Sequence, residues 1–154
     1  ERLAVPTVSD DVVRAFVHEV RRLSPFFPAV AGRARHPFTW DGVTIPAGAW
    51  VMLDLFGTNL DARTFPDPDT FDPTRFEGAP VVPPQLVPQG GGEHRTGHRC
   101  AGEEATAALM VAAVRQLTQH MTYVVPRQPL RLPLNRLPAL PDGFVITEVQ
   151  EVTR

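Results

Sequence analysis

The sequence predicts a mainly α-helical fold with a small β region. Two segments show helical patterns: one near the N-terminus carries a single apolar stripe, and one after residue 100 is rich in alanine. Short stretches with strand-like alternation lie between and after them. Proline supplies 17 of the 154 residues, about twice its usual share of ~5%. We therefore expect long ordered irregular segments rather than a simple helix bundle.

The first helix is expected over residues 10–23. Its apolar residues recur at three- and four-residue spacing and form one stripe: Val12, Val13, Phe16, Val17, Val20 and Leu23. Ser9 is a suitable N-cap, and Asp10 and Asp11 lie where the helix dipole favours negative charge. Pro25 and Pro28 should end the helix, because proline has no amide hydrogen to donate.

A β-rich stretch is expected next. Residues 38–45 alternate around Asp41-Gly42, a dipeptide typical of tight hairpins. Residues 50–55 are predicted to form a further strand, followed by a short helix near residues 56–60.

The second half begins with an irregular segment. Residues 61–89 have no periodicity and many prolines, but their aromatic side chains predict an ordered loop that packs on the rest of the chain. Gly90-Gly91-Gly92 opens a second loop that ends at Cys100. A long helix is predicted over residues 101–120, then strands near residues 122–125 and 144–148, separated by proline-rich turns.

Composition excludes several functional classes. The net charge of −2 favours neither nucleic acid nor anionic lipid as a partner. No stretch reaches the ~18 consecutive apolar residues of a membrane helix, and no signal-peptide pattern opens the chain. A single cysteine excludes an internal disulfide. We expect a cytoplasmic protein, and the start at Glu1 rather than methionine suggests a piece of a longer one.

Cys100 is the residue most suited to chemistry. It precedes a predicted helix N-terminus, where free amides and the dipole stabilise an anion, and His98 and Arg99 add donors nearby. These conditions favour a thiolate that acts as nucleophile or metal ligand. An inert, half-buried cysteine is the lesser interpretation, because its neighbours do not resemble a packed core. A zinc-type site of His94, His98 and Cys100 matches no common zinc spacing.

Two other charged groups are noted. Glu19 and Arg22 share a helix face, which by itself indicates only a solvated pair contributing about 0.2–0.5 kcal/mol. Arg33, with Arg35 and His36, forms a basic spot beside the predicted hairpin. Such spots are usually solvated, but an arginine here could pair with an acidic cofactor group.

Taken together, these pieces resemble the cytochromes P-450. The motifs occur in the family's order: E-V-R-R over residues 19–22, F-D-P-T-R-F over 71–76, and a glycine loop leading to H-R-C-A-G over 98–102. The resemblance covers nearly the whole chain. It implies that residues 1–154 are the C-terminal, haem-binding portion of a single larger domain, whose N-terminal part, including the distal helix, is missing from this sequence.

The resemblance also implies roles for individual residues. Cys100 would bind the iron of haem b as a thiolate, with His98 and, less certainly, Arg33 at the haem propionates. Gly92 and Gly102 would shape the ligand loop around the haem. The remaining implied residues are a buried structural triad (Glu19, Arg22, Arg75) and a substrate-pocket lining (Phe26, Phe27, Ala29, Val30).

One branch of the family is most similar. The family's usual aromatic and glycine, seven and four residues before the cysteine, are replaced here by Glu93 and Thr96. Residues 53–59, 88–92 and 97–103 instead look like the fatty-acid peroxygenases. That branch implies hydrogen peroxide as co-substrate, no redox partner, and α/β-hydroxylation or decarboxylation of long-chain fatty acids, whose carboxylate is held by an arginine of the distal helix. A reductase-dependent monooxygenase and a non-catalytic His/Cys metal-binding domain stay open as alternatives.

Overall fold

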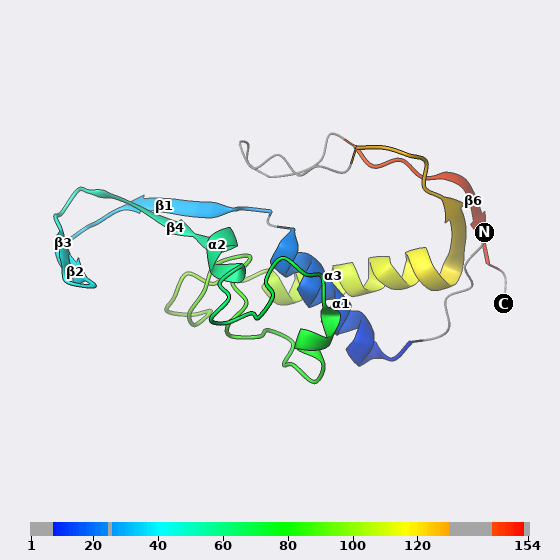
Figure 1. The fold of residues 1–154 in the computed structure, drawn as a ribbon, viewed down its shortest axis with the longest axis horizontal. Helices are drawn as coiled ribbons and strands as arrows, with labels where there is room; N and C mark the ends of the chain where they lie inside the picture. Colours follow the sequence, from blue (N-terminus) through cyan, green and yellow to red (C-terminus); the bar gives the residue numbers. More distant parts are fainter. Residues whose placement is uncertain (1–7, 25, 130–142, 153–154) are drawn as a thin grey trace.

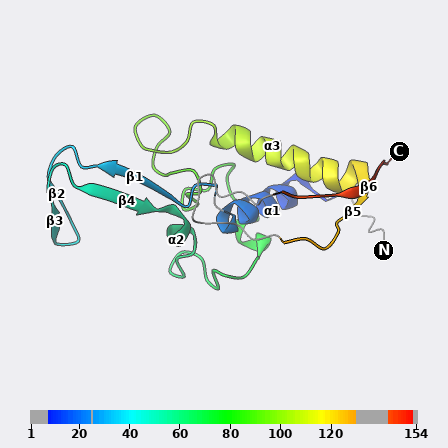
Figure 2. The same ribbon diagram turned by 90° about the horizontal axis from the view of Figure 1, so that it is seen from above.

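The computed structural model describes residues 8–24, 26–129 and 143–152. Two helices, α1 (Asp10–Leu23) and α3 (Glu103–Arg115), lie side by side in the middle of this part of the molecule (Figure 1, Figure 2). A β ribbon extends from one end, and a second pair of strands lies at the other. The expected class, mainly α with a small β region, is confirmed.

Helix α1 has the predicted bounds. The Ser9 side chain accepts a hydrogen bond from the Val12 amide (3.4 Å), and the Ser24 amide donates to the Val20 carbonyl (2.9 Å). Pro25 lies outside the described residues, so its part in ending the helix is untested. The buried face differs from the predicted stripe: Val12 and Phe16 are 44% and 38% exposed. Charged residues take a large share of the buried face, which a hydrophobicity pattern cannot anticipate.

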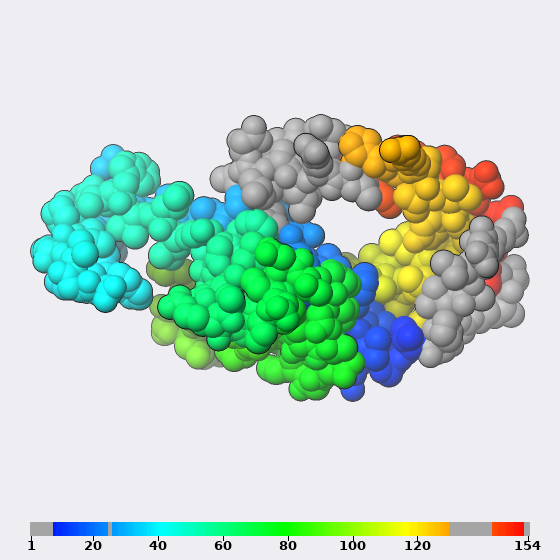
Figure 3. All heavy atoms as spheres, in the orientation of Figure 1, coloured from blue at the N-terminus to red at the C-terminus, as the bar shows by residue number. Residues whose placement is uncertain are grey.

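The β ribbon at one end is built from two antiparallel pairs. Strands β2 (Phe38–Trp40) and β3 (Val43–Ile45) form the hairpin predicted around Asp41-Gly42, both of which have positive φ (45° and 76°). Strand β4 (Trp50–Asp54) was expected, but its partner β1 (Ala29–Arg33) was not, because residues 29–33 carry no apolar alternation. The ribbon of β1 and β4 projects from the other described residues (Figure 3).

Helix α2 (Leu55–Asn59) follows β4, and Asp54 caps it by accepting from the Gly57 amide (2.7 Å). The irregular segment after α2 is ordered, as predicted, and contains a 3₁₀ turn, η1 (Pro73–Phe76), which packs on α1. A small core forms where they meet, from Ala15, Phe65, Phe76 and Leu86.

Helix α3 is shorter than predicted. Gly102 is its N-cap, and a π turn, η2 (Gln116–His120), follows Arg115. Strand β5 (Met121–Val124) pairs with β6 (Thr147–Glu151). Strand β6 begins three residues later than the predicted strand at 144–148. Its position is set by the pairing with β5 and by a hydrogen bond from the Val152 amide to the His120 carbonyl (2.9 Å). Most of the predicted proline-rich turns lie outside the described residues. Among the described residues, no helix is long and apolar enough to cross a membrane.

Candidate functional site

Cys100 lies at the end of a loop that is fastened to an earlier part of the chain. The Cys100 amide donates to the Gln89 carbonyl (3.0 Å), and the His98 amide donates to the Gly91 carbonyl (3.1 Å). The Cys100 side chain is exposed and free. The loop therefore presents an accessible thiol from a backbone that is held in place.

Two glycines make this fastening possible. Gly90 has a φ of +93°, and a Cβ built on it would overlap the His98 carbonyl oxygen, so no larger residue fits there. Gly92 has a φ of +81°. Gly102 is different, because its φ is −91°; the atom nearest to a Cβ built there is Cys100 Sγ, at 3.8 Å. Gly102 thus keeps the space next to the thiol open.

An apolar cavity of about 670 Å³ adjoins this loop. One wall is the face of the β ribbon on which Val30 and Leu53 are paired, and Phe38 and Val51 extend it. Gly90, Gly91 and His98 contribute the other wall. His98, with Asp54 and Thr58, is therefore one of the few polar groups in a mainly apolar lining.

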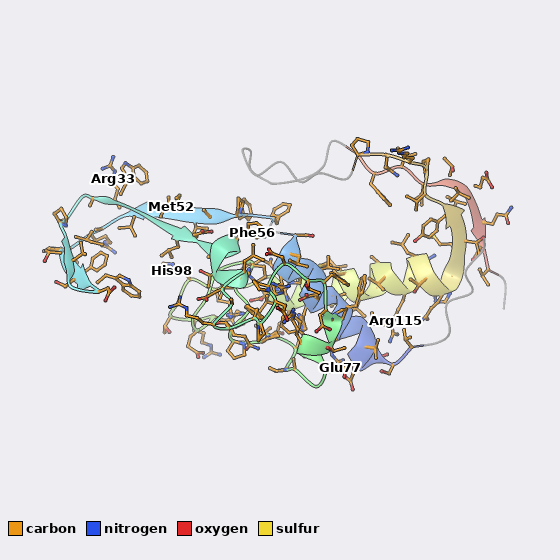
Figure 4. All side chains as sticks on the ribbon, in the orientation of Figure 1. Arg33, Met52, Phe56, Glu77, His98 and Arg115 are labelled. Atoms are coloured by element: carbon orange, nitrogen blue, oxygen red, sulfur yellow. The ribbon has the colours of Figure 1, made fainter. Side chains whose placement is uncertain are left out.

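Arg33 lies in the same ribbon and lines a second cavity, of about 440 Å³, together with His98. It is paired with Trp50 across the strands, its guanidinium lies 4.5 Å from the centre of the Trp50 ring, and it donates to the Gly48 carbonyl (2.9 Å). Figure 4 shows Arg33 near the far end of the ribbon and His98 on the ribbon's other side. The two predicted propionate partners therefore border one cavity, although they come from different parts of the chain.

The four residues expected to line a substrate pocket are also divided. Val30 lines the cavity beside His98, whereas Phe26 lines a separate one between α1 and α3 with Val20 and Met110. The Phe27 ring meets Phe26 edge-on, with ring centres 4.8 Å apart. Ala29 begins β1 opposite Asp54. Of the four, Val30 lines a cavity together with His98 of the Cys100 loop.

Glu19 and Arg22 form a buried ion pair, and both are 0% exposed. Arg22 Nε and Nη2 donate to the two carboxylate oxygens of Glu19 at 2.7 and 2.8 Å. The three remaining guanidinium hydrogens reach the backbone carbonyls of Asn59, Pro68 and Thr70. All five donors of this buried arginine are thereby used, which ties α1 to the irregular segment.

Arg75 joins this pair at a longer distance. Its Nε lies 3.5 Å from Glu19 Oε1, and its guanidinium also donates to the Pro66 and Asp67 carbonyls. The same Glu19 oxygen accepts the Asp72 amide at 2.8 Å. The structure therefore brings the three residues of the expected triad together around one carboxylate.

A second buried charge cluster was not anticipated. Glu103, at the start of α3 and 0% exposed, is paired with Arg21 of α1 and, at 2.7 Å, with Arg99 of the loop. Arg21 Nη1 also donates to His18 Nδ1 (3.1 Å). Burial first, and then Arg21, lowers the pKa of His18 to about 4, so this imidazole is neutral at neutral pH.

The sequence contained only a weak signal for this cluster. Arg99 and Glu103 are four residues apart, which is a pairing distance on a helix, but Arg99 precedes α3. Arg21 and Glu103 are 82 positions apart, and nothing local connects them. His94, His98 and Cys100 do not form a metal-binding group, and no group of three His, Cys, Asp or Glu suited to a metal occurs among the described residues.

The residues present fit the haem that the resemblance implies. The exposed thiol is the donor type that holds haem iron in thiolate-ligated proteins. Gly102 leaves space beside it, and the adjoining cavity has the apolar walls that a flat macrocycle requires. His98 at the cavity edge is a hydrogen-bond donor suited to a carboxylate.

Comparison with known families agrees with this fit. A family model described as cytochrome P-450 matches residues 11–141. Among curated proteins, beta-amyrin 28-monooxygenase of Panax ginseng is 32% identical over 127 residues, which are 78% of this chain and 26% of that protein. Taxane 10-beta-hydroxylase of Taxus cuspidata is 36% identical over 129 residues, which are 78% of this chain and 25% of that protein.

Solved structures are similar at higher identity. A structure of cytochrome P-450SP alpha (CYP152B1) in complex with (R)-ibuprophen has 47% identity and a TM-score of 0.82, with 92% of this chain and 35% of that chain covered. Cytochrome P-450EX alpha (CYP152N1) with myristic acid has 40% identity and a TM-score of 0.81, with 91% and 35% covered. A variant of cytochrome P-450 OleT in complex with arachidonic acid has 43% identity and a TM-score of 0.82, with 94% and 34% covered. The chain thus spans about a quarter of the length of these curated relatives and about a third of these solved chains.

Proposed function

Because the chain belongs to the cytochrome P-450 family, an oxidoreductase family, we propose that it is the C-terminal, haem-binding portion of a fatty-acid peroxygenase. The proposed reactions are hydroxylation, in which R–H and H₂O₂ give R–OH and H₂O, and decarboxylation, in which R–CH₂CH₂COOH and H₂O₂ give R–CH=CH₂, CO₂ and two H₂O. Both use hydrogen peroxide as the oxidant, so neither requires electrons from a redox partner.

The likeness to solved structures that contain fatty acids supports this proposal most. Identity to the myristic-acid and arachidonic-acid complexes is 40% and 43%, compared with 32% and 36% for the two plant monooxygenases.

In the proposed enzyme, Cys100 is the thiolate ligand of the iron. Haem b, when bound, supplies the chemistry that cleaves peroxide and transfers oxygen. His98 donates a hydrogen bond to a propionate, Gly92 and Gly102 keep the loop close to the ring, and Val30 with Leu53 excludes water from the apolar side. Phe26, Phe27 and Ala29 would line the substrate pocket together with the N-terminal part of the protein. Arg33, which lines a cavity with His98, would be the second propionate partner.

The triad of Glu19, Arg22 and Arg75 has a supporting role in this proposal. It fixes the irregular segment to α1 through four contacts of 2.7 to 3.5 Å: Arg22 donates to the Pro68 and Thr70 carbonyls, and Glu19 accepts the Asp72 amide and pairs with Arg75. The Asn59 side chain then accepts the Val87 amide (2.9 Å), just before the glycines that hold the Cys100 loop. The triad therefore positions the loop without contacting the reacting atoms.

A reductase-dependent monooxygenase is the second candidate. The specific observation in its favour is that the curated relative from Panax ginseng is named a monooxygenase. The two candidates share Cys100 and the haem and differ in the source of the oxidising equivalents.

The test uses the full-length parent protein with haem, a long-chain fatty acid and hydrogen peroxide, without any reductase. Mass spectrometry should detect the hydroxy acid or the terminal alkene. The methyl ester of the same acid is the matched control substrate, because it lacks the carboxylate that the arginine of the distal helix would hold in this branch, and it should give no product. Cys100→Ala should abolish both the thiolate-type spectrum and turnover. Product formation only with a reductase and a nicotinamide cofactor would overturn the peroxygenase proposal in favour of the monooxygenase.

A further inference from the structure

We propose that Arg21, Glu103 and Arg99 form a positioning cluster that sets the electronic character of Cys100 as an iron ligand. The proposal rests on the thiolate ligation proposed above. The three side chains come from α1, from the first turn of α3 and from the residue that precedes Cys100. None of them is part of the Glu19–Arg22–Arg75 triad.

The geometry of the cluster connects both helices to the ligand loop. Glu103 uses one carboxylate oxygen for Arg21 and the other for Arg99. Arg99 also donates to the carbonyls of Gly92 (3.1 Å), Pro84 (3.2 Å) and Leu86 (3.3 Å). The Arg99 guanidinium therefore connects three backbone carbonyls that precede Cys100 in the chain to the carboxylate of Glu103.

Arg21 reaches Cys100 by a second route. Arg21 Nη2 donates to the side-chain oxygen of Gln89 (3.2 Å), and the Gln89 carbonyl accepts the Cys100 amide (3.0 Å). The Gln89 side-chain nitrogen donates in turn to Thr106 Oγ1 of α3 (3.3 Å). The route from Arg21 through Glu103 ends at Arg99, the residue before Cys100, and the route through Gln89 ends at the Cys100 amide.

The cluster also has an uneven charge. Two buried arginines share one carboxylate, and His18 beside Arg21 is neutral because burial and Arg21 lower its pKa to about 4. One positive charge is left in a region of low dielectric, where its field is weakly screened. A net positive charge next to the loop that carries the thiolate withdraws electron density from that ligand and favours the reduced form of the iron.

The experiment measures the iron reduction potential of the full-length holoprotein and the absorption of its ferrous carbon-monoxide complex. Arg21→Met removes the extra positive charge and should shift the potential downward. Glu103→Gln removes the negative charge with little change of shape and should shift it upward. The double variant keeps the wild-type charge balance and should return the potential towards the wild-type value. Arg63→Met is the control, because Arg63 is an arginine with 89% side-chain exposure, and it should leave the potential unchanged.

The outcomes separate this inference from the proposed function. A cluster that only supports the fold would make both single variants lose the thiolate-type band in the same way, and the double variant would be worse than either. That result, or potentials that do not move in opposite directions, overturns the inference and leaves the ligation by Cys100 intact. A wild-type protein without a thiolate-type band would overturn both. If Arg21→Met does not retain haem, the reduction potentials of Glu103→Gln and the double variant still show whether the potential follows the charge of the cluster.

Discussion

Glu19→Gln tests the buried triad with the smallest change of shape. Glu19 is 0% exposed and accepts from Arg22 Nε, Arg22 Nη2 and the Asp72 amide within 2.8 Å. The substitution keeps one oxygen and replaces the other with an amide nitrogen, which is a donor. That nitrogen must face either an arginine N–H or the Asp72 N–H, so at least one donor loses its acceptor.

The cost has two parts. Removing one partner of a buried ion pair leaves the other charge uncompensated, at about 3–5 kcal/mol. Leaving a buried donor without an acceptor adds about 1–3 kcal/mol. Their sum is comparable with the whole free energy of unfolding of a typical domain, ~5–15 kcal/mol. We therefore expect Glu19→Gln to lose most of the folded holoprotein at the growth temperature.

The assay compares the haem content and urea unfolding midpoint of the full-length protein with and without the substitution. Asp61→Asn is the matched control: it makes the same acid-to-amide change in an ion pair whose arginine is 89% exposed, and it should change the midpoint little. A Glu19→Gln protein with normal haem content and an unchanged midpoint would refute the reasoning, because it would show that the buried carboxylate is not required as a counter-charge.

Two further predictions concern His18 and Gly90. The pKa of His18 is about 4 in the folded chain against an ordinary 6.5, so the unfolded chain takes up this proton first, and stability should fall by about 3 kcal/mol as pH falls through that window. We measure the free energy of urea unfolding at several pH values. It should change less with pH in His18→Gln, whose side-chain oxygen can still accept from Arg21. An unchanged pH dependence would contradict the lowered pKa of His18. Gly90→Ala should lose haem, because it combines left-handed strain of about 1–3 kcal/mol with overlap on the His98 carbonyl oxygen. Gly78→Ala has the strain but open space (φ +68°), so an equal loss in both variants would show that the overlap is unimportant.

Local signals explain what could be predicted. Ser9 and the two aspartates after it define the start of α1, and Asp41-Gly42 defines the β2–β3 turn, because caps and tight turns depend on residues a few positions apart. The context of Cys100 was recognised for the same reason, since the glycines, His98 and the following helix are neighbours in the chain.

The errors arose where an element depends on a distant partner. Strand β1 exists because β4 pairs with it across about 20 residues, and β6 is displaced because β5 selects its register. The contact between the Arg33 guanidinium and the Trp50 ring was not predicted either, because only the strand pairing brings that ring within reach.

The sequence by itself determined the cytochrome P-450 family and the residue that can ligate iron, since both depend on ordered motifs of adjacent residues. Only the tertiary structure decided the charge partners: Arg22 completes its five hydrogen bonds with carbonyls 37 to 48 positions away, and Arg21 meets Glu103 across 82. The physical reason is that a buried arginine needs an acceptor for each of its donors. Which groups supply them depends on the faces that α1, α3 and the irregular segment bring together, and no local pattern of residues contains that information.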